Sequence, residues 1–197
     1  GCATQFSRGS GSRRYIFDIG LHYVGDTSEG GMFHSLLSPL GIDIDFVPLD
    51  PDGFDTLIFP DFEFKIPTDR DLFRQRLLDL FPEERRGIDR YLRLVREVES
   101  VGRKLFGNHG RLGPGVLWHI LTRDHLMLLN QHATIESFLD SCTSNPKLRA
   151  VLLGQHGDYG MPPSEASAVL HAGLFAHLAT TPSYPKGGGQ IISDRLA

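Results

Sequence analysis

A long amphipathic helix sets the framework for any fold of this chain. Apolar side chains recur at spacings of three and four residues, at Ile88, Tyr91, Val95, Val98 and Gly102. Arginines and Glu97 occupy the other faces of the same segment. Because a helix with one apolar face buries that face against another element, the segment predicts a long helix packed on one side.

Helices are expected on both sides of this segment. A shorter one contains Leu72, Phe73, Leu77, Leu80 and Phe81, and Pro82 should end it because proline lacks the amide hydrogen. A glycine-rich loop is expected over Gly107–Gly115. Beyond it, Thr134 and Asn145 are typical N-cap residues, and Ser164 is expected to open an apolar helix that runs to Ala179.

Short strands are expected in the N-terminal part. Tyr15, Ile16 and Phe17 favour a strand, and ranges 43–48 and 54–64 carry period-two segments separated by Pro and Asp. We expect these two ranges to form one small antiparallel sheet. Strands that precede helices in this way predict an α+β fold.

Composition excludes several classes of protein. Hydrophobic residues make up 40% and charged residues 22% of the chain, which excludes intrinsic disorder and a collagen-like fibre. A net charge of -4 argues against a nucleic-acid partner, because such proteins carry basic surfaces. Two cysteines, Cys2 and Cys142, cannot form a disulfide framework or a zinc knuckle.

The ends of the chain and its apolar stretches bear on location. No signal-peptide pattern is present, and the weakly polar range 166–179 is shorter than the roughly 20 apolar residues of a transmembrane helix. We therefore expect a cytoplasmic or peripherally membrane-associated protein without an obligate protein partner. Residues 190–197 favour the opening turns of a helix, marginal alone, and predict an internal piece of a longer protein.

Common catalytic and metal patterns are missing. The nine histidines lack metal-ligand spacing, and His171 and His177 would point about 120° apart on a helix, so no metal site is expected. There is no G-x-S-x-G, and Cys142 lies in an apolar stripe that favours packing. The fingerprint G-x-G-x-x-G is also absent, because Arg14 stands where a third glycine would follow Gly9 and Gly11.

Two glycine-centred segments remain as candidates for function. They are FDIGLHYVGD at 17–26 and YPKGGGQIISDRLA at 184–197. Consecutive glycines allow positive φ and the close approach of another backbone or of a flat ligand. Taken alone, the second segment is better explained by a tight turn with a helix cap.

Taken together, these segments resemble the retinol saturase and carotenoid isomerase branch of the phytoene desaturase-like flavoproteins. The similarity also includes GCATQFSR at the start, FPEERRGIDRYLRLVREV and GDYGMPPSEASAVLHAGL, and it runs through the whole chain in the same order. It implies an enzyme that uses FAD, with NAD(P)H as one candidate electron donor. The reaction would be saturation, desaturation or isomerisation of a carbon–carbon double bond in a polyene or isoprenoid lipid. The family's N-terminal dinucleotide fingerprint and C-terminal FAD-binding segment are missing from this chain.

The resemblance also implies an organisation and a site. Residues 1–24 would be a remnant of the FAD domain with a flavin-facing turn, 25–182 the substrate domain, and 183–197 the return segment. The residues expected at the cofactor are Gly1, Cys2, Asp18, Gly20, Leu21, Gly187, Gly188 and Gly189. Lys186 and Gln190 are expected at the substrate, and His22 and Tyr23 are the expected catalytic groups.

Two other functions stay open from the sequence. An amine oxidase-like flavoenzyme would need a polar or aromatic amine site in place of a long apolar tunnel. A non-enzymatic lipid-binding or interaction module would use the apolar helices without flavin. The fragment alone is expected to be inactive, because the dinucleotide-binding part is missing.

Overall fold

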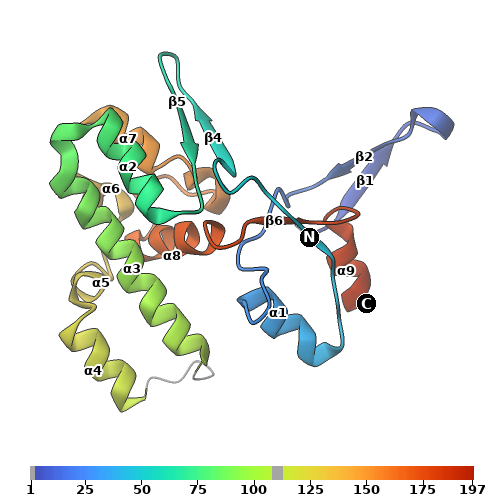
Figure 1. Ribbon diagram of the computed structural model, residues 1–197. Coiled ribbons are helices and arrows are strands. Elements are labelled where there is room, and N and C mark those ends of the chain that lie inside the picture. The colour runs from blue at the N-terminus through green and yellow to red at the C-terminus, as the bar shows by residue number, and fades with distance from the viewer. Residues whose placement is uncertain (1–2, 108–112) are drawn as a thin grey trace.

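The computed structural model describes residues 3–107 and 113–197, in which short strands lie mostly in the N-terminal part and helices follow one another through the rest (Figure 1). The strands are β1 (Gln5–Arg8), β2 (Tyr15–Asp18), β3 (Phe46–Pro48), β4 (Asp55–Ile58), β5 (Glu63–Ile66) and β6 (Ser183–Pro185). The α-helices are α1 (Met32–Leu37), α2 (Arg70–Leu80), α3 (Arg85–Gly107), α4 (Pro114–Thr122), α5 (His125–Leu129), α6 (Ile135–Asp140), α7 (Pro146–Leu152), α8 (Ala168–Leu178) and α9 (Gln190–Leu196). Short 3-10 turns are η1 (Gly11–Arg13), η2 (Ser38–Leu40), η3 (Pro82–Glu84) and η4 (His156–Tyr159). This mixture of helices and antiparallel strands confirms the expected α+β class.

In the described ranges the strands form three two-stranded antiparallel sheets. β1 pairs with β2, and β4 pairs with β5, each as a local hairpin. β3 pairs with β6 from the far end of the chain, with Val47 opposite Tyr184. The prediction of one small sheet from ranges 43–48 and 54–64 is therefore wrong, because local alternation does not reveal a distant partner.

α3 is the long amphipathic helix that the sequence predicts. Ile88, Tyr91 and Val95 on its inner face are fully buried. They lie against α8, where the rings of Tyr91 and Phe175 are 6.1 Å apart at an angle of 66°. Burial of this apolar stripe, at about 25 cal/mol per Å², makes the α3–α8 pair the centre of the domain.

Several helix ends follow the expected chemistry. α2 ends at Leu80, and its C-cap residue Phe81 lies directly before Pro82. The hydroxyl of Thr134 accepts a hydrogen bond from the Ser137 amide at the start of α6, and the side chain of Asn145 accepts from Lys147 and Leu148 at the start of α7. These bonds satisfy amides that have no partner within their helices.

The start of α8 differs from the prediction. Ser167, not Ser164, caps this helix and accepts from the Leu170 amide. Residues 163–165 form a turn, and Ser167 itself is extended and forms a β-bridge with Thr134. Beside this bridge, the Ala166 carbonyl accepts from the Ile135 amide at 2.8 Å. This distant bond fixes where the helix can begin, and a serine pattern alone does not report it.

Two helices, α4 and α5, were not predicted from the sequence. Part of the expected loop over Gly107–Gly115 lies outside the described residues, but Pro114 begins α4 instead of continuing a loop. Proline suits the first position of a helix, where its missing amide hydrogen costs nothing. Among the helices in the described ranges, none has both the length and the apolar character needed to cross a bilayer.

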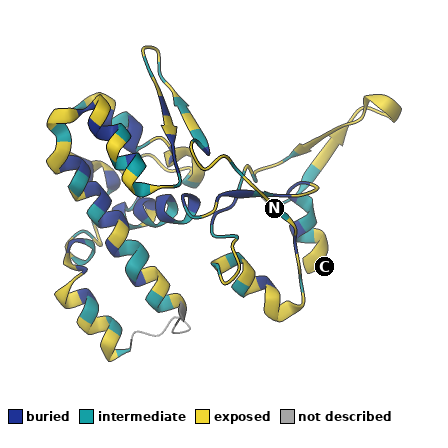
Figure 2. Ribbon diagram, in the orientation of Figure 1, coloured by how far each residue is buried: buried dark blue, intermediate teal, exposed yellow. Residues whose placement is uncertain are grey.

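Figure 2 shows buried residues along α3, α8 and β6. Most of the buried hydrophobic side chains in the described ranges belong to one of two clusters. The main core includes the inner faces of α3 and α8 together with side chains from β4, β5 and the helices around them. A smaller core consists of Leu37, Ile44 and Ile192, with Leu21 and Phe33 packed against it. The small core therefore joins α1 to both glycine-centred segments of the chain.

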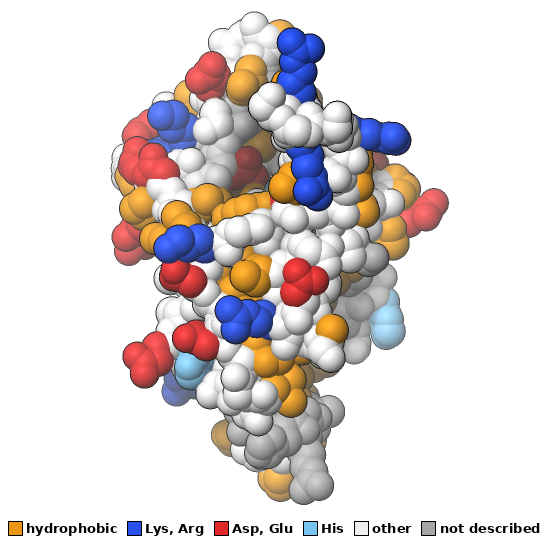
Figure 3. Space-filling view, turned by 90° about the vertical axis from the view of Figure 1, so that its right-hand side faces the viewer, with side chains coloured by type: hydrophobic (Ala, Val, Ile, Leu, Met, Phe, Trp, Pro, Cys, Tyr) orange, Lys and Arg blue, Asp and Glu red, His pale blue; other side chains and the backbone are white. Residues whose placement is uncertain are grey.

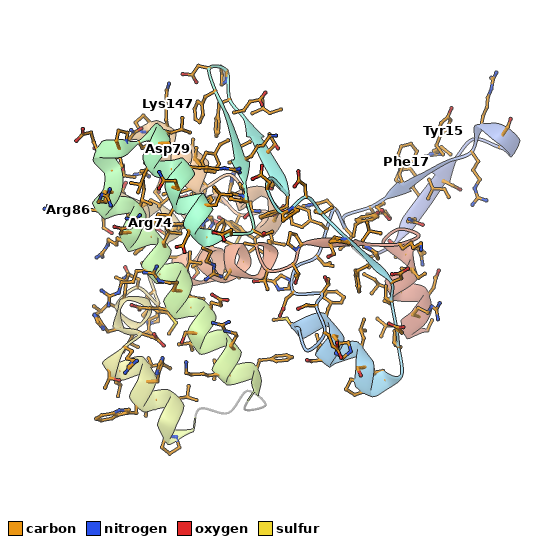
Figure 4. The ribbon with its side chains drawn as sticks, viewed as in Figure 1. Tyr15, Phe17, Arg74, Asp79, Arg86 and Lys147 are labelled. Atoms are coloured by element: carbon orange, nitrogen blue, oxygen red, sulfur yellow. The ribbon has the colours of Figure 1, made fainter. Side chains whose placement is uncertain are left out.

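The β1–β2 hairpin projects from the rest of the molecule (Figures 1 and 4). Tyr15 and Phe17 are exposed on it, and Phe17 stacks on Phe6 of the paired strand with ring centroids 5.2 Å apart. The side of the molecule that carries the hairpin mixes hydrophobic, acidic and basic side chains (Figure 3). The hairpin is thus held mainly by its own cross-strand contacts.

Candidate functional site

The two glycine-centred segments meet in space. Asp18 is the last residue of β2, and its carboxylate accepts a hydrogen bond of 3.0 Å from the Gly189 amide at the start of α9. A second bond ties the same regions, since the backbone amide of Gln5 donates to Oε1 of Gln190 at 3.0 Å. Segments separated by almost the whole chain therefore form one corner of the molecule.

Glycine is required at this corner for backbone reasons. Gly187 and Gly188 have φ values of +98° and +92°, which side chains of L-residues strongly disfavour. A Cβ on Gly188 would also lie 1.8 Å from the side-chain nitrogen of Gln5. The turn closes with a 3.0 Å bond from the Gly188 amide to the Pro185 carbonyl.

The exposed backbone of this corner decides whether a flat ring could lie against it. A Cβ on Gly187 would meet only the tip of Ile191 at 3.8 Å, so its backbone is open to an approaching group. Leu21 supplies a half-buried apolar side chain next to Gly189, and Gly20 is exposed. The exposed backbone at Gly20 and Gly187 therefore fits a flavin ring laid against it, whereas Gly188 and Gly189 are buried under Gln5, Asp18 and Leu21. The Gly189 amide is already bonded to Asp18, so it is not free to bind the ring.

His22 and Tyr23 belong to a neighbouring polar cluster. Nε2 of His22 lies 3.4 Å from a carboxylate oxygen of Asp158, and the His22 ring is exposed. The Tyr23 hydroxyl donates to Asp55 at 3.2 Å and accepts from the Gln155 amide group at 2.9 Å. The other amide atom of Gln155, its Oε1, is buried without a hydrogen-bond partner in the described part of the chain.

Burial and charge perturb the titration of this cluster. Burial is the largest cause that raises the pKa of Tyr23, and the nearby carboxylates of Asp55 and Asp158 raise it further. Burial also raises the pKa of Asp158, partly offset by His22 and His156. A carboxylate made more basic in this way binds a proton, or a protonated imidazole, more readily.

Lys186 and Gln190 point to different partners. The ammonium group of Lys186 lies 3.2 Å from Asp45, and both side chains are exposed. Gln190 bonds to Gln5 and to Asp194 within its own helix. The structure therefore brings Gln190 to the glycine corner but directs Lys186 outward, and a substrate role for either stays a prediction.

Gly1 and Cys2, which were expected at the cofactor, lie outside the described residues. Cys142 packs against the main core, as expected from its apolar stripe, and burial raises the pKa of its thiol.

Four residues of the site were missed by sequence reasoning. Gln5, Asp55, Gln155 and Asp158 each hold a group that the sequence had singled out. Gln5 and Asp158 stand in GCATQFSR and GDYGMPPSEASAVLHAGL, two segments of the family resemblance, but no role was expected for either residue. Asp55 and Gln155 carried no signal, because an ordinary polar residue in a strand or a turn forms no recognisable motif.

Comparison with known proteins indicates the class of protein that this chain resembles. No family model matches the sequence, and no solved structure matches it. Curated proteins that are named as reductases do match, and these are oxidoreductases.

The relatives carry one particular name, all-trans-retinol 13,14-reductase. The chain is 27% identical to the protein of Danio rerio, 28% to that of Rattus norvegicus and 27% to that of Homo sapiens. In each case the match covers 98% of this chain and 32% of the relative. The resemblance to the retinol saturase branch is thus confirmed, and the chain spans about a third of the length of these curated relatives.

Proposed function

We propose that this chain is part of an FAD-dependent oxidoreductase of the phytoene desaturase-like type that acts on a carbon–carbon double bond of a polyene lipid. The names of the relatives favour reduction and an all-trans-retinol-like substrate. The observation that carries the proposal is the 3.0 Å bond between Gly189 and Asp18. It joins the two segments that the family resemblance assigns to the same cofactor.

The proposed division of the chain follows the same reasoning. Residues 1–24 and 183–197 would be edges of an FAD-binding domain, and 25–182 would be the substrate domain. The two crossings between these parts lie side by side, since Val24 and Ser183 exchange backbone bonds of 2.9 and 2.8 Å. Paired crossings are typical of a domain inserted into another, because insertion needs neighbouring ends.

The chemistry is divided between cofactor and chain. When bound and reduced by a two-electron donor, for which NAD(P)H is a candidate, the flavin would supply the hydride. Reduction of a double bond also needs a proton on the other carbon. His22 can hold that proton at Nε2 beside Asp158. The next residue, Tyr23, is fixed in place because its hydroxyl donates to Asp55 and accepts from Gln155.

The test uses a longer protein that contains this chain. We expect the purified protein to hold flavin and to convert all-trans-retinol to its dihydro product. His22→Gln should lower kcat by about 10²-fold or more and leave the flavin content unchanged, as expected for a proton donor. His132→Gln, at another exposed histidine, should change neither quantity.

Two results would contradict the proposal. A longer protein that never holds flavin would favour a lipid-binding module without redox chemistry. A flavoprotein that oxidises amines and leaves retinol unchanged would favour the amine oxidase alternative. If His22→Gln were as active as the unaltered protein, His22 would have no part in the mechanism, and the rest of the proposal would stand.

A further inference from the structure

An apolar groove lies between α1 and the C-terminal end of α3. Its volume is about 720 Å³, and it is lined by Met32, Ser35, Leu36, Pro39, Gly102, Leu105 and Phe106. Ser35 is the only residue with a polar side chain among these lining residues. Met32, Leu36 and Phe106 remain 38%, 54% and 44% exposed, so the groove presents apolar surface to whatever enters it.

A glycine in the middle of a helix forms the floor of the groove. Gly102 belongs to the apolar face of α3, yet a Cβ built on it would meet no atom within 4 Å. A helix-interior glycine costs about 1 kcal/mol relative to alanine, because it loses more backbone freedom on folding. Here its missing side chain leaves open the space that Leu105 and Phe106 flank.

α1 links this groove to the glycine corner. Phe33 and Leu37 on one side of α1 pack in the small core with Leu21 and Ile192. Met32 and Leu36 lie one residue earlier in each turn and face the groove. α1 therefore lies between the groove and the proposed flavin-facing turn, and a helix with its side chains is about 10–12 Å across.

We propose that this groove binds the hydrocarbon part of a polyene substrate, of which all-trans-retinol is the representative. This inference rests on the proposed function. The volume falls within the range of about 300–1,000 Å³ typical of small-molecule sites, and the lining is almost free of groups that need hydrogen bonds. A polyene offers few such groups, so its affinity must come from burial of apolar area.

Another large cavity fits this ligand poorly. Its volume is about 600 Å³, but its walls include Asp43, Asp45, Thr27, Thr181 and Ser183. Burying a hydrocarbon against these groups would remove carboxylates and hydroxyls from water without a compensating hydrogen bond. The chemistry of the two cavities therefore directs a polyene to the groove beside α1.

The test fills the groove without making it polar. All-trans-retinol is titrated into the 197-residue chain, and binding is followed by the fluorescence of the retinol. Gly102→Leu should weaken binding by about tenfold or more, because the new side chain occupies the ligand's space. The matched control is Gly115→Leu in α4, which also adds leucine to an open helical glycine; its binding should equal that of the unaltered chain.

Four outcomes would overturn the groove assignment. The first is that the unaltered chain does not bind retinol, and the second is that Gly102→Leu binds retinol as tightly as the unaltered chain. The third is that both leucine variants weaken retinol binding to the same extent. The fourth is that Gly102→Leu changes only flotation with phosphatidylcholine vesicles or dimer formation. Thermal unfolding of each variant reports whether it remains folded.

A second measurement separates this inference from the proposed function. In a longer flavin-loaded protein, Gly102→Leu should raise KM for retinol and leave flavin content unchanged, because Gly102 does not contact the glycine corner. An unchanged KM would overturn the groove assignment even if retinol were reduced. A longer protein without flavin would overturn the proposed function, whatever the isolated chain binds.

Discussion

His171 in α8 is a buried neutral base with three partners. Its Nε2 lies 3.1 Å from the Leu152 carbonyl oxygen and 3.1 Å from the Tyr91 hydroxyl. Its Nδ1 lies 3.1 Å from the Tyr159 hydroxyl. Since a carbonyl can only accept, Nε2 carries the proton of the neutral ring, and the Tyr159 hydroxyl donates to Nδ1. Burial lowers the pKa of His171 to about 4.

This lowered pKa predicts how stability depends on pH. The unfolded chain binds the proton of this histidine near pH 6.5, whereas the folded chain binds it only near pH 4. The contribution of His171 to the free energy of unfolding is therefore fully present above pH 6.5. It is lost as the pH falls toward 4, by up to about 3 kcal/mol. Urea unfolding at a series of pH values in this range measures the loss.

A variant isolates the contribution of His171. His171→Gln should reduce the dependence of unfolding free energy on pH, although it also lowers stability at neutral pH. His132→Gln, at an exposed position, should leave that dependence as it is. A pH dependence that persists fully in His171→Gln would assign the effect to other groups.

At the scale of elements, two glycines of α3 have opposite roles. A Cβ on Gly87 would lie 2.1 Å from the carbonyl oxygen of Cys142, so the absence of a side chain lets the chain beyond α6 approach. A Cβ on Gly102 would meet nothing within 4 Å. The same residue type thus serves contact at one position and open space at the other.

Alanine substitutions should therefore change stability in opposite directions. Gly102→Ala should raise the free energy of unfolding by about 1 kcal/mol through helix propensity. Gly87→Ala should lower it by about 1–3 kcal/mol, because the backbone of Cys142 must move. The midpoint of urea unfolding checks both. Shifts of the same sign would contradict the close approach seen at Gly87.

The elements that could be predicted were those set by local chemistry. The spacing of Ile88, Tyr91 and Val95 was enough for α3, and Thr134 and Asn145 were enough for two caps. The partner of β3 and the true start of α8 depend on backbone bonds to distant residues. Such bonds form only after the chain has packed, so no local pattern contains them.

At the scale of the whole molecule, the site is made by segments from both ends of the chain. The glycine segments around 20 and 188 were found from the sequence, and their approach was expected from the family resemblance. The polar groups that hold them are the backbone amide of Gln5 and the side chains of Asp55, Gln155 and Asp158, and these contacts became visible only in three dimensions. Their roles depend on which neighbours the fold provides.

If the corner at Gly187 lies against a flavin, as proposed, a side chain added there should lower the flavin-to-protein ratio of a longer protein. Gly187→Leu places a side chain in space that is otherwise open. Gly41→Leu is the matched control, because Gly41 also has a positive φ, of +70°, and open surroundings. Both variants carry similar backbone strain of about 1–3 kcal/mol.

Gly187→Leu should lose most of its flavin, while Gly41→Leu should keep the ratio of the unaltered protein. Equal flavin ratios in all three proteins, with Gly187→Leu still folded, would contradict the proposed position of the flavin.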